Sequence, residues 1–266
     1  MNAPASSPSR LVFVLVDGLR DDTARRCMGY VRALHEAGRA RWDTLRCELP
    51  SLSRPLYATV MSGRLPVDHG VVSNEQRGVR CDETFFDDLH ARGKRSVAAA
   101  YDWFFELLAG ERFEPVLHRT AACAARGVIA GSWYYEDDYP DSHLLVDAED
   151  LRRRLQPDLL FVHPMGLDNA GHLFGGESSQ YELAARKLDK ELSLRVPQWL
   201  ANGYDVVLTS DHGMSADRVH GGDSREEREV PFVWLPHGGD AQAAPAHWPR
   251  SQLEIRRFAV ARVLGD

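Results

Sequence analysis

LVFVLVDG, at residues 11–18, is the stretch that decides the fold. Six consecutive apolar residues, most of them β-branched or aromatic, precede Asp17 and Gly18. A short apolar run of this composition is typical of a buried strand. The strand ends of an α/β sheet are where ligands are presented, so we expect Asp17 to have a functional role.

Three further segments place Asp or His directly after an apolar run. They contribute Asp168 and His172 in LDNAGH (167–172), Asp211 and His212 in VVLTSDHGM (206–214), and His220 in VHGG (219–222). Asp168 and His172 are four positions apart, which puts both on one face if the segment is helical. Asp, His and a hydroxyl are ligands that Zn²⁺ accepts. One Asp-His pair could simply be an aspartate that orients a surface histidine, but the whole set indicates a two-metal hydrolase.

Strand-like and helix-like segments alternate along the chain. This alternation is typical of a mostly parallel sheet covered by helices, so we expect the α/β class. The expected strands are Leu11–Val16, Arg41–Glu48, Ser96–Ala100, Asp158–His163, Asp205–Ser210 and Glu229–Leu235. The expected helices are 23–37, one that starts at Ser53-Arg54-Pro55, 84–92, 177–200 and 251–263.

The alternation weakens between about residues 101 and 150, where aromatic residues concentrate in YDWFFELL (101–108) and GSWYYEDDYPDSH (131–143). This region is a candidate for a small aromatic-rich insert that caps the site and supplies walls for an organic group. The alternative is that Trp103, Phe104 and Phe105 belong to the core and that 136–138 is a solvated loop. In either case we expect residues 1–266 to form a single α/β domain.

Composition narrows the function classes. The 266 residues are 44% hydrophobic and 27% charged, which suffices for a sizeable core. The net charge of −7 and the lack of a Lys/Arg-rich run argue against a nucleic-acid partner. A small molecule that carries phosphate remains compatible, because bound metal ions reverse the local field.

The first residues, MNAPASSPSR, lack the basic and apolar regions of a signal peptide, and the apolar run after them has only six residues. Cys27, Cys47, Cys81 and Cys123 have no CxxC spacing, which favours reduced thiols. We therefore expect a cytoplasmic protein with no membrane partner. The oligomeric state stays open.

The motifs also carry a family resemblance. LVFVLVDGLR (11–20), LPSLSRPLYATVMSGRLPVDHGVVSN (49–74), MGLDNAGH (165–172), TSDHGM (209–214) and HGG (220–222) followed by REVPF (228–232) resemble, in this order, the alkaline phosphatase superfamily. They are most similar to its nucleotide pyrophosphatase/phosphodiesterase branch. The resemblance implies a doubly wound α/β fold with helices on both faces, two Zn²⁺ ions, with Mn²⁺ as an alternative, and a covalent phosphoseryl intermediate.

The resemblance also implies a ligand set. It assigns Asp17, Asp211 and His212, together with the nucleophile, to one zinc ion, and Asp168, His172 and His220 to the other. His237 and His247 are kept as alternatives to His220, because members with large inserts take their last histidine from further down the chain. His69 and His163 also lie in matching segments, and we expect them to be structural.

Ser53 is the expected nucleophile, because LPSLSRPLY matches the family's Pro-Ser-x-Thr/Ser-x-Pro segment, and Ser51 is the alternative. A position at a helix N-terminus and coordination to Zn²⁺ both favour a serine alkoxide. Asn74 matches an asparagine that hydrogen-bonds a non-bridging phosphoryl oxygen, although it is equally compatible with a turn. Arg54 either clamps phosphate through its planar fork or points to solvent.

The function expected from these features is a two-zinc phosphoric ester hydrolase, a phosphodiesterase or nucleotide pyrophosphatase acting on a small phosphate ester or nucleotide-like substrate. Asn74 and the aromatic segment favour diesters. A phosphomonoesterase or a phosphonate hydrolase could share the metal ligands. A sulfatase fits less well, because Pro50 stands where its modified Cys or Ser belongs. The alternative from another class is a metal-bound but inactive binding protein, and the complete set of ligands argues against it.

Overall fold

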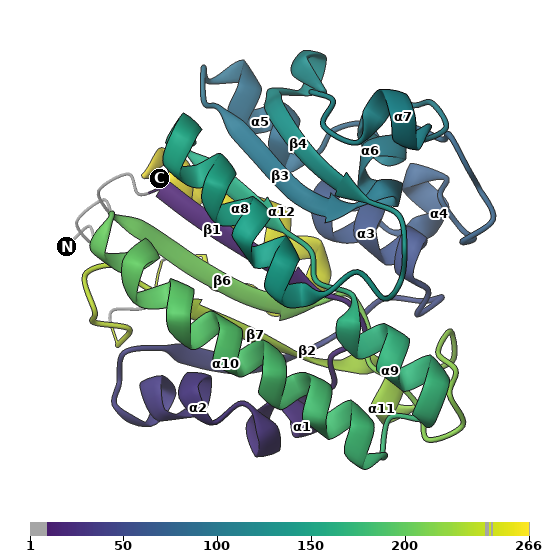
Figure 1. The fold of residues 1–266 in the computed structure, drawn as a ribbon, viewed down its shortest axis with the longest axis vertical. Helices are drawn as coiled ribbons and strands as arrows, with labels where there is room; N and C mark the ends of the chain where they lie inside the picture. Colours follow the sequence, from purple (N-terminus) through teal and green to yellow (C-terminus); the bar gives the residue numbers. More distant parts are fainter. Residues whose placement is uncertain (1–9, 243–244, 246, 266) are drawn as a thin grey trace.

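The computed structural model describes residues 10–242, 245 and 247–265. One seven-stranded sheet, in the order β2-β7-β6-β1-β5-β3-β4, organises the described residues (Figure 1). The strands are β1 (Arg10–Val16), β2 (Arg41–Arg46), β3 (Ser96–Tyr101), β4 (Val128–Tyr134), β5 (Leu159–Val162), β6 (Tyr204–Ser210) and β7 (Glu229–Leu235). β7 runs antiparallel to β2 and β6, and the other neighbouring pairs are parallel. The predicted mostly parallel sheet is confirmed.

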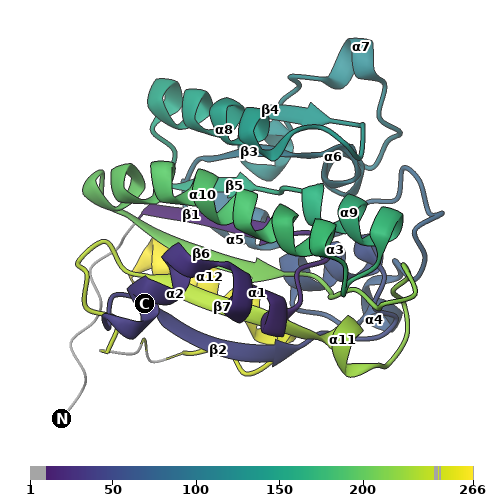
Figure 2. The same cartoon turned by 60° about the horizontal axis from the view of Figure 1, so that its bottom comes forward.

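Helices cover both faces of this sheet (Figures 1 and 2). One face carries α1 (Asp21–Cys27), α2 (Gly29–Glu36), α8 (Asp141–Leu155) and α10 (Ser179–Ala201). The other carries α3 (Ser53–Ser62), α5 (Phe85–Ala91), α6 (Asp102–Ala109) and α12 (Ile255–Leu264). The remaining elements are α4 (Pro66–His69), α7 (Pro115–His118), α9 (Gly166–Phe174), α11 (Arg225–Arg228), and the 3-10 turns η1 (Ala124–Arg126) and η2 (Gln252–Glu254). The doubly wound α/β class is therefore confirmed.

β1 forms the centre of the core and fixes the edge at which polar residues gather. All side chains from Leu11 to Val16 are 0% exposed, because helices cover both faces of the strand. In the register of the sheet, Val16 pairs with Ser210 of β6, and Val14 pairs with Val162 of β5. The residues that follow these three strands therefore leave the sheet at the same edge.

Two parts of the sequence reading need correction. The helix expected over 23–37 is two helices, α1 and α2, separated at Met28, whose backbone has φ −91° and ψ 76°. Residues 101–150 contain five elements that the sequence did not suggest: α6, α7, η1, the edge strand β4, and most of α8. Phe104 and Phe105 are buried, as the core alternative states. That this region caps a substrate stays a prediction.

Two properties of the described residues bear on the environment of the chain. None of their helices combines the length and the apolarity that a bilayer-spanning segment needs. All four cysteines are free thiols and are buried.

Candidate metal centre

The carboxyl ends of the central strands bring the predicted ligands together. Asp17 follows β1, Asp211 and His212 follow β6, and Asp168 lies on α9 shortly after β5. Gly18 makes this approach possible: its φ is +70°, and a Cβ there would lie 3.0 Å from the Asp168 Cα. Segments distant in sequence therefore meet at one edge of the sheet.

Asp168, His172 and His220 form one cluster. The Nε2 atom of His172 lies 3.3 Å from one Asp168 carboxylate oxygen, and the Nε2 atom of His220 lies 3.6 Å from the other. The two Nε2 atoms are 3.2 Å apart. The three side chains could hold one metal ion, which is the grouping expected for one of the two zinc sites.

A second cluster surrounds His212, whose Nε2 lies 3.3 Å from Asp17 Oδ1 and 3.2 Å from Asp211 Oδ2. Asp17, Asp168 and His212 also lie close enough to share one ion. Asp168 therefore lies between the two clusters, whereas the expected ligand set assigns it to the first cluster alone. Asp211, which that set assigns to the second cluster, contacts His212 there. The rings of His212 and His220 stack at 3.7 Å, which brings the two clusters next to each other.

The three histidines are held in one tautomer. Their Nδ1 atoms lie 2.8–2.9 Å from backbone carbonyl oxygens: His172 from Arg218, His212 from Gly213, and His220 from Ser51. A carbonyl oxygen only accepts, so each Nδ1 carries a proton and donates it. In the neutral rings, each Nε2 lone pair is therefore left for the cluster, which is how metal-binding histidines are oriented.

The carboxylates lack the partners that buried charges need. Asp17 and Asp211 are fully buried, and one oxygen each of Asp17, Asp168 and Asp211 has no hydrogen-bond partner. Burial and the charge of Asp17 raise the pKa of Asp211 well above its usual value. Burial would also raise the pKa of Asp17, but hydrogen bonding to His163 and the charges of His212 and His163 lower it to about 2. Crowded carboxylates beside imidazole lone pairs suit divalent cations.

Ser53, rather than Ser51, presents a hydroxyl to this centre. Ser53 is the first residue of α3, and its Oγ lies 3.0 Å from His212 Nε2. The Ser51 hydroxyl instead donates to the Gly222 carbonyl at 2.7 Å and accepts from the Gly221 N–H at 3.0 Å. Ser51 therefore anchors the loop that carries His220. Ser53 is the serine whose hydroxyl faces the metal-ligand clusters.

Asn74 and Arg54 are bound to each other. The Arg54 backbone N–H donates to Asn74 Oδ1 at 3.0 Å, which leaves the Asn74 amide nitrogen as a donor. The Arg54 side chain is 0% exposed: Nη1 donates to Glu106 at 2.8 Å, and Nε donates to the Asn74 carbonyl at 3.1 Å. Trp103 lies against the guanidinium at 4.3 Å. Arg54 thus does not point to solvent. Its Nη2 has no partner among the described residues, but a bidentate phosphate clamp would require breaking the bond of Nη1 to Glu106 or the bond of Nε to the Asn74 carbonyl.

The sequence reading missed several contacts of the centre. Tyr57, the last residue of LPSLSRPLY, donates a hydrogen bond to Asp17. His163, expected to be structural, is buried with its Nε2 3.4 Å from Asp17 Oδ2. Its position directly after an apolar strand was the available signal. Glu106 gave none, because a single Glu in an aromatic run identifies no partner.

The alternative histidines lie elsewhere. His237 contacts Asp205, at the start of β6, with an Nδ1–Oδ1 distance of 2.8 Å. His247 is 3.1 Å from Arg257 of α12. His69 contacts Thr59 at 3.0 Å, and its structural role stays a prediction. Neither His237 nor His247 joins the clusters, so His220 is the histidine that the fold brings to the centre.

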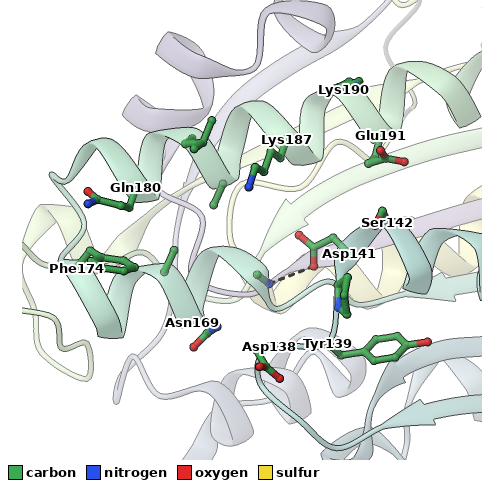
Figure 3. Close-up of a pocket in the computed structure, with 15 residues that line it drawn as sticks. Asp138, Tyr139, Asp141, Ser142, Asn169, Phe174, Gln180, Lys187, Lys190 and Glu191 are labelled. Atoms are coloured by element: carbon green, nitrogen blue, oxygen red, sulfur yellow. Dashed lines mark hydrogen bonds between the residues drawn. The ribbon is translucent and has the colours of Figure 1, made fainter.

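A cavity of about 590 Å³ is lined by residues of α9 other than Asp168 and His172 (Figure 3). Asn169 and Phe174 of α9 line it, and the Lys187 side chain points into it from α10. Asp141 at its edge accepts a hydrogen bond from the Gly166 N–H at 3.1 Å. This contact fixes the first turn of α9, the turn that carries Asp168.

Comparison with known proteins agrees with this geometry. Human GPI ethanolamine phosphate transferase 2, catalytic subunit, is 24% identical over 261 residues, which are 91% of this chain and 25% of that protein. An uncharacterized pyrophosphatase/phosphodiesterase of Schizosaccharomyces pombe is 22% identical over 231 residues, which are 78% of this chain and 45% of that protein. This chain spans about a quarter of the length of the transferases that it matches.

Solved structures share the fold. Phosphonoacetate hydrolase of Sinorhizobium meliloti 1021, in complex with phosphonoacetate, has a TM-score of 0.62 at 13% identity and covers 99% of this chain and 100% of that one. Murine ectonucleotide pyrophosphatase/phosphodiesterase 5 has a TM-score of 0.59 at 15% identity and covers 77% of this chain and 57% of that one. Residues 11–222 match the family described as type I phosphodiesterase / nucleotide pyrophosphatase. The chain belongs to this family, within the alkaline phosphatase superfamily.

Proposed function

We propose that the protein is a two-metal phosphodiesterase or nucleotide pyrophosphatase in which Ser53 receives the phosphoryl group as a phosphoseryl intermediate. One observation carries the proposal: the Ser53 hydroxyl lies 3.0 Å from His212, beside crowded carboxylates that lack partners. Family membership supports phosphoester chemistry of this general type.

The residues present fit two divalent cations. Asp168, His172 and His220 would hold one, and Asp17, Asp211 and His212, with Ser53, would hold the other. When bound, Zn²⁺ or Mn²⁺ supplies positive charge that favours the Ser53 alkoxide and offsets negative charge on the phosphoryl and leaving-group oxygens. This expectation rests on the donor set of buried carboxylates and imidazoles.

The residues of the chain account for the remaining steps. Ser53 loses its proton to solvent water, its oxygen bonds to phosphorus, and the bond from phosphorus to the departing alkoxide breaks, after which that alkoxide takes up a proton from water. The N-terminus of α3, where Ser53 stands, favours the negative charge of both the alkoxide and the phosphoryl group. The Asn74 amide N–H groups donate to a non-bridging oxygen whose charge grows in the transition state. The oxygen of a water molecule then bonds to phosphorus, and the bond from phosphorus to the Ser53 oxygen breaks. The Ser53 oxygen takes up a proton, which restores the hydroxyl.

The state of Arg54 favours a diester over a monoester. A monoester has three charged oxygens to satisfy, and a nearby free guanidinium would serve it. Arg54 is the cation next to the nucleophile, but its Nε and Nη1 are committed to Asn74 and Glu106, Trp103 covers the guanidinium, and only Nη2 lacks a partner in the described part of the chain. A diester has one charged oxygen fewer and suits such a site.

Transfer to an alcohol is a second candidate, supported by the alignment of most of this chain with GPI ethanolamine phosphate transferases. The same phosphoseryl intermediate would then pass its group to an acceptor hydroxyl in place of water. Cleavage of a phosphonate is a third candidate, supported by the coverage of phosphonoacetate hydrolase. All three rely on Ser53 and the same ligands, so they differ in substrate and acceptor only.

The test compares bis-p-nitrophenyl phosphate, p-nitrophenyl phosphate and phosphonoacetate with Zn²⁺, with Mn²⁺, and with a chelator. We expect the diester to be the best substrate, with turnover abolished by the chelator. An added alcohol that yields a phosphorylated alcohol would identify the transferase. Absence of turnover under every condition, in protein that still binds metal, would contradict the proposal and favour the inactive binding protein.

A further inference from the structure

Glu106 is the centre of a buried polar cluster outside the metal ligands. Its carboxylate accepts hydrogen bonds from Arg54 Nη1 at 2.8 Å, Arg77 Nε at 2.9 Å, and the backbone N–H groups of Gly78 at 3.2 Å and Phe113 at 3.1 Å. Its side chain is 0% exposed. A buried carboxylate with this many donors is costly to disturb, because each donor would lose its partner.

The cluster connects three separate segments. Glu106 lies on α6, Arg54 is the second residue of α3, and Arg77 and Gly78 belong to the irregular segment between α4 and α5. That segment also carries Asn74. The segment has no helix or strand between residues 71 and 84, and hydrogen bonds from Arg54 hold Asn74 in it.

Arg54 transmits the position of Glu106 to Asn74. The guanidinium of Arg54 donates to Glu106 through Nη1 and to the Asn74 carbonyl through Nε. The planar fork fixes the direction of both bonds at once. The backbone N–H of Arg54 meanwhile donates to Asn74 Oδ1. The main chain and the side chain of Asn74 are thus both held by the residue that follows Ser53.

We propose that Glu106 is a positioning residue for phosphoryl transfer, which holds the Asn74 amide at the phosphoryl oxygen through Arg54. This inference rests on the proposed function of Ser53 and Asn74. Glu106 itself touches neither substrate nor metal ligand. Its effect on catalysis must therefore disappear once the Asn74 amide is gone.

A double-mutant cycle tests this dependence. We expect Asn74→Ala to lower kcat/KM for bis-p-nitrophenyl phosphate about 100-fold, the size of a lost oxyanion donor, with most of the loss in kcat. Glu106→Gln should lower it about 10- to 100-fold. The double variant should lie within about 3-fold of Asn74→Ala alone. If the fold-losses of kcat/KM in the two single variants multiply in the double variant, the proposal is overturned. Such independence would mean that Glu106→Gln damages the fold generally and does not act through Asn74.

Asp102→Asn is the matched control. Asp102 lies on the same helix and pairs with the same Arg77, at 3.1 Å, but makes no hydrogen bond to Arg54 in the described structure. We expect this variant to stay within about 3-fold of wild type. A loss equal to that of Glu106→Gln would mean that the whole ionic cluster matters, and would overturn a specific role for Glu106.

Arg54→Lys covers the case in which Glu106→Gln does not fold. Lysine keeps the charge beside Glu106 but cannot direct two fixed N–H groups at Glu106 and the Asn74 carbonyl. We expect a similar loss of kcat/KM that is likewise absent in the Asn74→Ala background. A loss that persists there would contradict transmission through Arg54.

Binding of inorganic phosphate separates this inference from the proposed function. We expect calorimetry on the metal-loaded protein to show weaker phosphate binding in Asn74→Ala and Glu106→Gln, with no further weakening in the double variant. Equal metal content and thermal unfolding in all variants are required controls. If the wild type turns over no ester, the proposed function fails. Phosphate binding to the two single variants and the double variant still decides whether Glu106 acts through Asn74.

Discussion

Replacing Asp211 by Asn should have opposite effects on stability with and without metal. Asp211 is fully buried, its Oδ2 lacks a partner, and burial together with the charge of Asp17 raises its pKa well above the usual value. In the metal-free protein the carboxylate is therefore unfavourable. An amide keeps the Oδ1 acceptor for the Gly18 N–H and removes the buried charge.

The size of the effect follows from the two states. Removing a buried charge with an unpartnered oxygen should raise the free energy of unfolding of the metal-free protein by about 1 to 2 kcal/mol. In metal at about 1,000 times Kd, wild type gains about 4 kcal/mol from one site, whereas a variant with about 100-fold weaker binding gains about 1 kcal/mol. The order of stability should therefore reverse, with wild type ahead by about 1 to 2 kcal/mol.

Thermal unfolding measures this reversal directly. Both proteins are scanned in chelator and in excess Zn²⁺, where 1 kcal/mol corresponds to roughly 2 °C in Tm for a chain of this size. We expect the variant to melt higher in chelator and lower in Zn²⁺. A variant that melts lower in chelator and gains as much from Zn²⁺ as wild type would refute the assignment of Asp211 as a ligand.

Three further predictions concern single residues. Ser53→Ala should abolish ester turnover with metal content retained. Ser51→Ala should lower Tm, because the Gly221 N–H and the Gly222 carbonyl lose their partner. If turnover is lost in Ser51→Ala and kept in Ser53→Ala, Ser51 is the nucleophile. Burial raises the pKa of Asp102 to about 7, so the folded protein holds a proton that the unfolded chain releases near pH 4, and the unfolding free energy falls as pH rises between these values. Denaturant titrations should show Asp102→Asn gaining about 4 kcal/mol relative to wild type from pH 4 to pH 8, and a constant difference would rule this out. Elemental analysis should find unchanged metal in His237→Gln and less metal in His220→Gln, since only His220 lies at the clusters; the reverse result would reassign the ligand.

The sequence predicts most of the sheet because its central strands are apolar throughout. Leu11–Val16 and Asp205–Ser210 were expected within one residue of β1 and β6, since a run buried on both faces has a strong local signal. β4 escaped notice, because its segment VIAGSWY contains a glycine and its residues are buried in no regular pattern, as expected where an edge strand is partly covered. No proline or N-capping serine lies at Met28, so the sequence carries no signal for the helix break there.

The candidate site was predictable in its residue types and less so in its support. Asp and His after apolar strands are visible in sequence, and the family resemblance fixed their grouping. The orientation of the Arg54 side chain could not be predicted from the sequence, because its partner Glu106 lies 52 residues away on another helix. The choice between Ser51 and Ser53 depended on register, and the hydrogen bonds of Ser51 to Gly221 and Gly222 supply the physical reason.

The most direct test of the account is to locate metal in the loaded protein. Elemental analysis combined with anomalous diffraction at the zinc edge gives both the number of ions and their positions. The account predicts two ions per chain, one at Asp168, His172 and His220, and one at Asp17, Asp211 and His212 beside the Ser53 oxygen. Protein that binds no ion at these residues, or holds its ions elsewhere, would contradict it.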